Sequence, residues 1–521
     1  MSLKYLPNRI LFQNNKLFNI NLFSSIFRQQ YHKINIRKRY LATVSSSTSS
    51  DLLENIYDIV IVGGGISGSA LACALASSSK ITGSQKRVAI IESSDTSNIK
   101  GWKPIKGEFS NRVSSLTPRS VEFFKELILS IFRILGIGVW QNIEEERIKP
   151  FKDMQVWDGI SDARIKFNNE NTGIGPLAWI LENYNIHHAI LKTLDQYKED
   201  SDVDFLDNTK VQKISFDKEN KDEPFDLSDW PCVELSNGKK LKTRLLVGAD
   251  GINSPVRSFA NIDSLGWDYN SHAVVATLHV DSNVENKTAW QRFLPTGPIA
   301  MLPLQNGYSS MVWSTTPNLA NKIRSMSSND FVHLVNAAFQ LRMADLEYFY
   351  SQLGDGESVD FQNEFEWRKD VQSKNSNYKE EFPPIVLGVQ EKTRAGFPLR
   401  MRNAESYIKE RIVLVGDAAH TIHPLAGQGL NQGLADVQCL LKVIEQGIIN
   451  GQDIGDINLL REYSSERYFA NIMMLGVVDK LHKLFGTSLT PIVLARSFGL
   501  KVLDNFDPIK AEIMKFAMGT E

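Results

Sequence analysis

The hydrophobic pattern is densest between Asp58 and Glu92, where two short apolar runs flank an alanine-rich stretch. Residues 57–62 are apolar and β-branched, which is typical of a strand buried on both faces. Residues 70–76 form a compact apolar stretch of helix-forming residues, and residues 87–91 form a second strand-like run before Glu92. The pattern therefore predicts a βαβ unit at the start of the folded chain.

Glycines join the first strand of this unit to its helix with the spacing G-x-G-x-x-G, at Gly63, Gly65 and Gly68. In such a loop the first glycine permits a tight turn, the second lets a pyrophosphate approach the backbone, and the third lets helix and strand pack closely. The helix start adds free N–H groups and a positive dipole end. Glu92, after the second strand, can accept hydrogen bonds from a ribose diol. The motif alone is weak, but in this context it predicts a dinucleotide site.

Two further apolar runs end in a glycine and an aspartate. Residues 245–251 lead to Asp250, and residues 411–417 lead to Gly416 and Asp417. For Asp250 an ordinary Asp-Gly turn and a cofactor contact are both open interpretations. Asp417 follows a predicted buried strand, where its carboxylate is placed to hold ribityl or phosphate oxygens.

Residues 423–431 read His-Pro-Leu-Ala-Gly-Gln-Gly-Leu-Asn and lead into a predicted helix over about 432–446. Pro424 and two glycines before a helix start indicate a backbone shaped around a ligand, with its amides facing an electron-rich edge. His420 and His423 suggest metal or acid–base chemistry, but no third ligand is nearby. We therefore predict that both histidines are structural or lie beside a cofactor, and we predict no metal site.

The rest of the pattern predicts a second sheet and several helices. A hairpin is predicted over 232–246, and consecutive strand-like runs over 272–315 predict an antiparallel sheet. Residues 330–353 have helical character, whereas 354–381 are polar without clear periodicity and predict an exposed insertion. Residues 463–485 carry apolar side chains at helical spacing, which usually indicates core or a subunit contact.

The first fifty residues hold eight Lys or Arg and no Asp or Glu, and they end in a serine-rich stretch. This composition predicts a mitochondrial targeting segment over residues 1–50, cleaved near residues 39–41. The alternative, a basic arm that binds nucleic acid, ranks lower because a complete absence of acids is a demanding pattern. Removal of the segment leaves 50 basic and 60 acidic residues, so the mature chain is acidic.

The overall composition excludes several classes of protein. The formal net charge is −2, which gives no indication of nucleic-acid binding. The three cysteines are widely spaced, which argues against a disulfide framework and a thiolate metal site. No uninterrupted apolar run has the length of a membrane span.

Together these segments resemble the class A flavoprotein aromatic hydroxylases, and within them the UbiH-type ubiquinone-biosynthesis monooxygenases with their mitochondrial Coq members. The most specific segment is 423–431, which is close to a family signature. The other matching segments are 63–68, 112–114, 154–159, 182–183, 248–257, 397–399 and 416–422.

The resemblance implies an α/β fold in which a Rossmann-like FAD-binding domain is interleaved with an antiparallel-sheet substrate domain, as in p-hydroxybenzoate hydroxylase, followed by C-terminal helices. After the targeting segment, the expected FAD-binding domain covers 57–260, with substrate-side strands inserted. The substrate domain covers 270–400 with the polar insertion 354–381, residues 405–450 close the FAD-binding domain, and 451–521 are helical.

The resemblance also implies how FAD is held. Glu92 would bind the adenosine ribose, Arg112 and Asn183 would lie near the flavin's linker, and Asp250 and Asp417 would flank the cofactor. Pro424, Gly427, Gln428 and Gly429 would pass beside the isoalloxazine ring. The full expected set of cofactor contacts is Gly63, Gly65, Gly68, Glu92, Arg112, Asn183, Asp250, Gly416, Asp417, Gly429, Leu430 and Asn431.

The implied activity is FAD-dependent hydroxylation, with O2, of a polyprenyl 4-hydroxybenzoate at ring C5, ortho to the phenol, in ubiquinone biosynthesis. The family implies electrons from ferredoxin and ferredoxin reductase, a multi-subunit biosynthetic complex, and a peripheral position on the matrix side of the mitochondrial inner membrane. The candidate surface for docking to the membrane-associated assembly is the helical stripe of Ile472, Leu475, Val478, Leu481 and Phe485, and the alternative is that this stripe only packs the core. Two alternatives stay open: an FAD-dependent hydroxylase of a soluble aromatic, and a non-catalytic FAD-fold lipid carrier or scaffold.

Overall fold

The computed structural model describes residues 55–125, 136–168, 175–216, 227–283, 285–354, 359–375, 381–424 and 427–519, with the backbone of 128–130 and 133–134. Residues 56–521 belong to one unit. The predicted targeting segment 1–50 lies outside the described residues.

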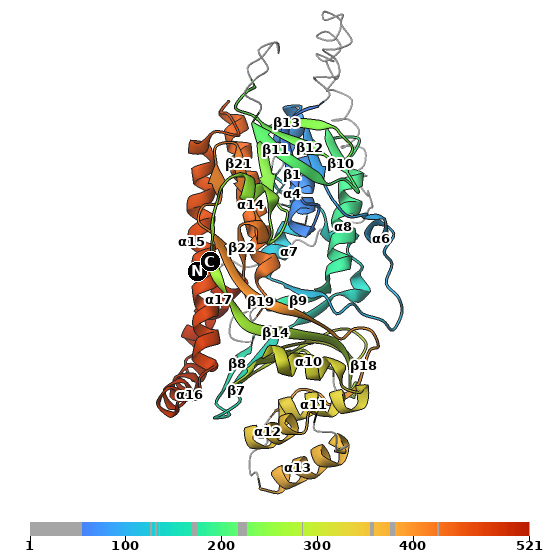
Figure 1. Cartoon of the computed structure of the whole chain (residues 1–521), viewed down its shortest axis with the longest axis vertical. Helices are drawn as coiled ribbons and strands as arrows, with labels where there is room; N and C mark the ends of the chain where they lie inside the picture. Colours follow the sequence, from blue (N-terminus) through green and yellow to red (C-terminus); the bar gives the residue numbers. More distant parts are fainter. Residues whose placement is uncertain are drawn as a thin grey trace, which may run out of the picture. The chain divides into compact units, whose positions relative to one another are not determined.

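Among the described residues, an eight-stranded sheet carries the predicted βαβ unit (Figure 1). Its central strand β1 (Ile56–Val62) is parallel to β2 (Val88–Ile91) and to β13 (Lys240–Gly248). Parallel strands β10 (Val203–Leu206) and β21 (Ile412–Leu414) lie beyond these two. The predicted hairpin is confirmed as β12 (Pro231–Leu235) and β13, and β11 (Val211–Phe216) and β20 (Ile408–Lys409) add further antiparallel pairs.

Helix α4 (Ile66–Ser77) follows the glycine loop and is buried along most of its length. Its small alanine side chains let it pack against two further helices, α8 (Asn183–Gln196) and α14 (Gly429–Ile449). Short elements complete this part of the molecule: α5 (Ser79–Gly83), α6 (Ser97–Lys100), α7 (Pro118–Phe124), α9 (Pro255–Phe259), η1 (Trp140–Asn142), η2 (Glu145–Arg147) and η3 (Gly416–Ala418).

A nine-stranded sheet forms a second layer within the described part of the chain. It contains β7 (Asp153–Asp158), β8 (Arg164–Asn168), β14 (Ser264–Val280), β15 (Thr288–Leu294), β16 (Gly297–Pro303), β17 (Tyr308–Thr315), β18 (Val386–Val389), β19 (Ala395–Ala404) and β22 (His420–Thr421). Its pairs are antiparallel except that β15 runs parallel to β7. The predicted antiparallel sheet is therefore confirmed, with one parallel pair where an earlier segment of the chain joins it.

Three helices cover one face of this sheet: α10 (Pro317–Ser325), α11 (Ser328–Gln340) and α12 (Met343–Ser351). Their apolar side chains share a core with Trp157 and Trp313 of the strands. Two smaller sheets join β3 (Val113–Leu116), β9 (Ala178–Glu182) and β6 (Lys149–Phe151), and β4 (Ile128–Ser130) with β5 (Arg133–Ile134).

The segment 354–381 contains a helix that its sequence pattern did not predict. Residues 361–375 form α13 (Phe361–Asn375), which packs against α11. Phe361 and Phe365, one turn apart, are its buried anchors. The helix was missed because two buried aromatic residues in a largely polar segment, with Trp367 exposed, give almost no amphipathic signal.

Three C-terminal helices complete the chain: α15 (Ile457–Phe485), α16 (Thr490–Asp504) and α17 (Asp507–Met518). Helix α15 begins in the core of the first sheet, with Tyr463, and ends against the second, where Phe485 stacks on Phe293. A buried ion pair fixes α16 to the second sheet, because Arg496 donates to both carboxylate oxygens of Asp158 at 2.9 and 3.0 Å. No helix in the described ranges is long and apolar enough to cross a membrane.

The predicted docking stripe on α15 needs correction. Leu475, Val478 and Phe485 are buried, and only Ile472 of the five residues is exposed. Phe485 and Leu481 pack into a core of the second sheet, and Leu475 and Val478 are buried within the molecule, so the structure matches the alternative in which this stripe packs inward. A different set of apolar side chains faces solvent on the C-terminal helices.

Candidate active site

The three glycine turns lie side by side at one edge of the first sheet. The register pairs Val62 with Gly248 and Gly248 with Leu414, so β1, β13 and β21 end at the same level. Carboxyl ends of adjacent parallel strands are where open α/β sheets bind ligands. The turns after these strands therefore form one site, although they are far apart in the sequence.

The first turn is closed by backbone contacts that require glycine. Gly63 has φ of +104°, and a Cβ at this position would lie 2.3 Å from the carbonyl oxygen of Ala249. A Cβ on Gly68 would meet the carbonyl oxygen of Gly63 at 1.9 Å. Gly65 differs, because a Cβ there would meet no atom within 4 Å. The space beside Gly65, at the start of α4, is thus open for a pyrophosphate.

Glu92 lies directly after β2 and closes the other side of this turn. Its two carboxylate oxygens accept from the N–H groups of Gly64 and Ser94, each at 2.7 Å. Oε1 also accepts from the Ser93 hydroxyl at 3.3 Å, so these bonds fix the carboxylate and leave Oε2 with capacity for a second donor. The arrangement fits a ribose diol.

Asp250 lies after β13 and carries an unmatched polar atom. Its Oδ2 accepts from the N–H of Val256 at 3.0 Å, whereas its buried Oδ1 has no hydrogen-bond partner among the described residues. Burial raises the pKa of this carboxyl, and hydrogen bonds from Ser254 and Val256 oppose the shift. A buried acceptor without a donor is rare and costly, so it fits a site completed by a cofactor hydroxyl.

Gly416 and Asp417 form the third turn. Gly416 has φ of +59°, and a Cβ on Gly416 or on Gly433 of α14 would crowd the Ser67 hydroxyl at 3.0 or 2.6 Å. The close approach of these residues joins the third turn to the first. The Asp417 side chain is exposed, yet the protein around it still desolvates the carboxyl and raises its pKa, an effect that His420 opposes. Because the side chain keeps solvent contact, we take the desolvation to be partial.

A buried carboxylate behind the third turn holds it in place. Asp436 of α14 is fully buried and accepts from the Gly416 N–H (3.0 Å), His420 (2.5 Å) and Arg467 of α15 (2.8 Å). Asn471 adds a bond of 3.1 Å. Burial alone would raise the pKa of Asp436, but His420 and Arg467 outweigh it and lower the pKa to about 2. The carboxylate is therefore ionised, and its four partners come from the third turn, β22 and α15.

Arg112 and Asn183 are brought together by the pairing of β3 with β9. The Asn183 N–H donates to the Arg112 carbonyl oxygen at 3.0 Å, and Asn183 Oδ1 accepts from Ser114 at 2.7 Å. The Arg112 side chain is exposed. Asn183 keeps its amide NH2 for another acceptor, because no bond from that group is formed among the described residues.

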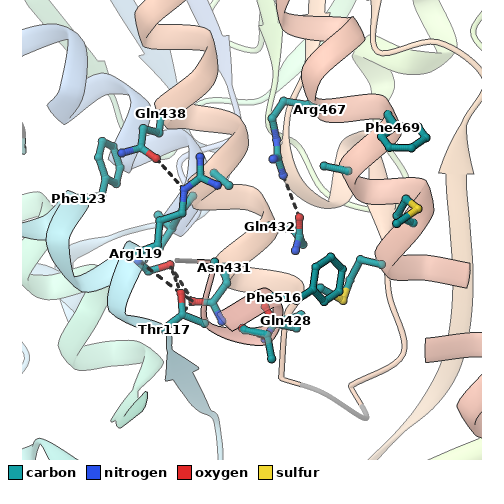
Figure 2. A pocket seen from close by; sticks show the side chains of 18 residues that line it. Thr117, Arg119, Phe123, Gln428, Asn431, Gln432, Gln438, Arg467, Phe469 and Phe516 are labelled. Atoms are coloured by element: carbon teal, nitrogen blue, oxygen red, sulfur yellow. Dashed lines mark hydrogen bonds between the residues drawn. The ribbon is translucent and has the colours of Figure 1, made fainter. Parts of the chain in front are cut away.

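The loop before α14 lies between the two sheets, and two of its residues, 425 and 426, lie outside the described residues. The side chain of Asn431 is saturated by protein. Its oxygen accepts from the Thr117 N–H and from Ser120 (Figure 2), and its NH2 group donates to the Ser115 and Gly427 carbonyls. The Gln428 side chain donates to the Ala517 carbonyl of α17. Only the backbone of Gly429, Leu430 and Asn431, in the first turn of α14, thus remains to meet a ligand.

An apolar cavity of about 110 Å³ lies between this loop and the second sheet. Its walls include Met154, Ala289, Ala300, Val312, Pro424 and Gly427. No acidic, basic or cysteine side chain is among the described residues that line it. The cavity can orient a ring and exclude water, but it offers no side chain for proton transfer.

The two histidines differ in their surroundings. His420 is bonded to Asp436, whereas His423 packs edge-on against Tyr269 and near His482, each with ring centroids 5.0 Å away. Burial, with a contribution from His482, lowers the pKa of His423 to about 3. No group of three or more His, Cys, Asp or Glu side chains in the described segments is placed to hold a metal ion. The three cysteines are free and buried.

Sequence reasoning missed the residues that support the turns. Asp436 and Arg467 lie inside helices, where charged residues are ordinarily solvent-exposed. Ser67 and Gly433 meet only through tertiary packing. Asp436 lies on the apolar side of its helix, four residues before Leu440. A charged residue on the apolar side of a helix was the sequence signal that could have identified it as a buried, paired group.

Comparisons with known proteins indicate the family to which this chain belongs. Residues 362–473 match the family described as FAD binding domain. The chain is similar to ubiquinone biosynthesis monooxygenase COQ6, mitochondrial, of Xenopus tropicalis, with 39% identity over 89% of this chain and 93% of the relative. The same protein of Saccharomyces cerevisiae is 37% identical over 93% and 97%, and that of Homo sapiens is 36% identical over 89% and 93%.

Solved structures share the fold at lower identity. p-Nitrophenol 4-monooxygenase PnpA from Pseudomonas putida superposes with a TM-score of 0.60 at 17% identity, covering 89% of this chain and 99% of that one. Klebsiella pneumoniae HpxO complexed with FAD gives 0.57 at 16% identity, with the same coverages of 89% and 99%. These likenesses confirm the p-hydroxybenzoate hydroxylase-like fold class.

The fold and the three turns define an FAD-dependent monooxygenase of the flavoprotein hydroxylase class, and the predicted cofactor FAD is confirmed. Because relatives 36–39% identical span most of this chain and of their own lengths, the chain belongs to the COQ6 family of ubiquinone biosynthesis monooxygenases. The predicted enzyme class and its role in ubiquinone biosynthesis are thereby confirmed.

Replacing the buried carboxylate tests the support of the third turn. We expect Asp436→Asn to lower the free energy of unfolding at pH 7 by about 3–5 kcal/mol, because Arg467 would keep a buried charge without its counterion. The wild-type carboxylate, with its pKa lowered to about 2, contributes stability that is present above its unfolded pKa and lost as pH falls. The difference between the proteins should therefore shrink by about 1 kcal/mol between pH 5 and pH 3.

Urea unfolding followed by tryptophan fluorescence measures both effects. Asp370→Asn, at an exposed position of α13, is the matched control. A constant difference across this pH range would contradict the ionised, paired state of Asp436.

Proposed function

We propose that the enzyme hydroxylates the ring of a polyprenyl 4-hydroxybenzoate at C5, ortho to the phenol. The observation that carries this proposal is the apolar cavity at Pro424 and Gly427, which is bounded by the loop that the resemblance places beside the flavin. Its walls suit an aromatic ring, and its lack of acid–base side chains suits a reaction whose chemistry belongs to the cofactor. FAD, when bound, supplies the activation of O2 that ring hydroxylation requires.

Three carboxylates and one open backbone turn are proposed to hold FAD. Glu92 binds the adenosine ribose through the free capacity of its Oε2, and the open space at Gly65 receives the pyrophosphate. Asp250 accepts a cofactor hydroxyl at its unpaired Oδ1, and Asp417 holds ribityl or phosphate-side hydroxyls from the neighbouring turn. Gly63, Gly68 and Gly416 shape these turns.

The remaining contacts lie toward the ring system. Arg112 and Asn183 approach the linker from the β3–β9 pair, where the Asn183 NH2 group supplies a donor. The backbone of Gly427, Gly429, Leu430 and Asn431 passes the isoalloxazine ring. For Asn431 and Gln428 this role belongs to the backbone, because their side chains are bonded to protein.

The electron donor and the location of the enzyme in the mitochondrion form the second part of the proposal. One dinucleotide-binding βαβ unit occurs in the described residues, and it is assigned to FAD. The family resemblance gives ferredoxin with ferredoxin reductase as the electron source. The polyprenyl tail requires access to lipid, because each buried CH2 is worth about 0.8 kcal/mol. The enzyme therefore works peripherally on the matrix side of the mitochondrial inner membrane, within a multi-subunit biosynthetic complex.

Flavin content distinguishes a cofactor contact from an exposed acid. We expect Asp417→Ala to lose roughly tenfold or more in FAD affinity, because a charge-assisted hydrogen bond is worth about 1.5–3 kcal/mol. Asp370→Ala, which removes an exposed carboxylate paired with Lys374, should keep its FAD. Absorbance of the two purified variants decides, and equal flavin content would count against the proposed role of Asp417.

Filling the cavity tests the substrate site. Ala300→Phe places a phenyl ring in the apolar cavity, and we expect hydroxylation to fall roughly a hundredfold because the substrate ring loses its productive position. FAD content should be unchanged, and Ala300→Ser is the control of similar size. Mass spectrometry of the product formed from a polyprenyl 4-hydroxybenzoate gives the rate and the ring position. Full activity of Ala300→Phe would show that the cavity is not the substrate site. Turnover of a soluble phenol equal to that of the polyprenyl 4-hydroxybenzoate would favour the soluble-aromatic alternative.

Processing of the chain tests the location. We expect residues 1 to about 41 to be removed on import, because that segment is basic and free of acids. N-terminal sequencing of protein isolated from mitochondria checks this, and an intact Met1 or Ser2 would refute it.

A further inference from the structure

Helix α16 presents a row of large apolar side chains to solvent. Leu494, Phe498 and Val502 follow one another at four-residue spacing, which places them on one side of the helix. Phe498 is 70% exposed and Leu494 is 66% exposed. The opposite side of α16 is buried through Val493, Arg496 and Leu500. This helix is therefore apolar on both sides, and among the described residues only one of these sides is packed against the rest of the protein.

The two neighbouring helices continue this surface. On α15, Phe469, Met473 and Val477 repeat the four-residue spacing and are exposed. On α17, Ile509 and Ile513 do the same. Helix α16 contacts both α15 and α17. We call the exposed rows on α15, α16 and α17 the C-terminal apolar face.

A pocket of about 300 Å³ lies between α15 and α17, beside the exposed row of α15. Phe469 and Met473 of α15 line it together with Phe516 of α17, and Arg119 of α7 lies at its other side (Figure 2). The pocket thus has apolar side chains on one side and polar groups, among them the Arg119 guanidinium group and the Gln438 amide, on the other. An acyl chain with an anionic headgroup matches this combination.

Charge separates this end of the chain from the rest. Residues 480–519 contain six basic and three acidic residues, whereas the remainder of 51–521 contains 44 basic and 57 acidic residues. Lys480 and Lys501 lie beside the exposed rows, and neither forms an ion pair with another described residue. A net-positive stretch of the chain thus includes the exposed apolar side chains of α16 and α17.

The face also lies next to the substrate cavity. On the inner side of α17, Met514 and Met518 are buried in one cluster with Phe151 and Ala289. Phe151 and Ala289 are also walls of the apolar cavity. A single layer of side chains therefore separates the inner side of α17 from the place where the ring would bind.

From these observations we propose that the C-terminal apolar face inserts into an anionic phospholipid bilayer and places the cavity next to the lipid. The inference rests on the proposed function, because a polyprenylated substrate gives the docking its purpose. A bilayer fits better than a second copy, since two copies meeting through this face would bring like charges together. Large apolar side chains with lysines beside them are the features of helices that lie in a membrane interface.

Vesicle flotation tests the proposal on FAD-loaded protein isolated from mitochondria. Vesicles of phosphatidylcholine alone are compared with vesicles of phosphatidylcholine and cardiolipin. We expect wild type to float with the cardiolipin vesicles, and Leu494→Gln with Phe498→Gln to partition at least about tenfold more weakly. Lys480→Gln with Lys501→Gln should lose the preference for cardiolipin. The matched control, Ile105→Gln with Leu387→Gln, replaces two equally exposed apolar residues on other elements and should float like wild type.

The variants should fold, since all substituted side chains are exposed. Flavin content and circular dichroism check that each variant is folded. The proposal is overturned if wild type does not float, if the control loses binding equally, or if Leu494→Gln with Phe498→Gln dissociates a dimer instead. Hydroxylation of a substrate with a short prenyl chain separates this inference from the proposed function. Flotation without hydroxylation would support membrane docking through the C-terminal apolar face and refute the proposed reaction. Hydroxylation without flotation would support the reaction and refute membrane docking.

Discussion

A single buried carboxylate holds together the parts of this enzyme that come from distant stretches of sequence. Asp436 has no exposed surface, so its charge is tolerable only with donors on every side. Those donors are the Gly416 amide, His420, Arg467 and Asn471, which belong to the third turn, to β22 and to α15. The network fixes the left-handed turn at Gly416 and, through α14, the contact of Gly433 with Ser67 in the first turn. The alignment of the first and third glycine turns thus depends on the Asp436 carboxylate.

The two sheets contribute different kinds of groups to the site, polar turns from the first and apolar side chains from the second. The first sheet ends in backbone turns whose amides and carboxylates suit phosphates and hydroxyls. The second sheet contributes an apolar wall from β7, β15, β16 and β17. Asn431 anchors the loop between them, because its side chain bonds both the start of α7 and the loop itself. The polar end therefore holds the cofactor rigidly, and the apolar end orients a ring away from water.

The C-terminal helices complete the molecule in a way that leaves one side uncovered. The pair between Arg496 and Asp158 is buried on both partners, so α16 is fixed to the second sheet by a charge that needs its counterion. That attachment uses one side of α16 and turns the row of Leu494, Phe498 and Val502 outward. Helix α15 contributes Leu459, Leu460 and Tyr463 to the first core and Phe485 to a core of the second sheet, while Leu475 and Val478 between them are also buried.

The sequence by itself determined the local elements and the chemistry of the turns. The βαβ unit, the hairpin 232–246, the strands of the second sheet and the three glycine turns all follow from period, β-branching and glycine spacing, which act over a few residues. Only the tertiary structure decided which turns meet, because the register of β1, β13 and β21 joins residues hundreds of positions apart. It also decided that the Asn431 side chain serves the protein, that α13 forms on two aromatic anchors, and which side of each C-terminal helix is buried. Helical spacing marks an apolar side but not its partner, since burial depends on surfaces that only the folded chain brings together.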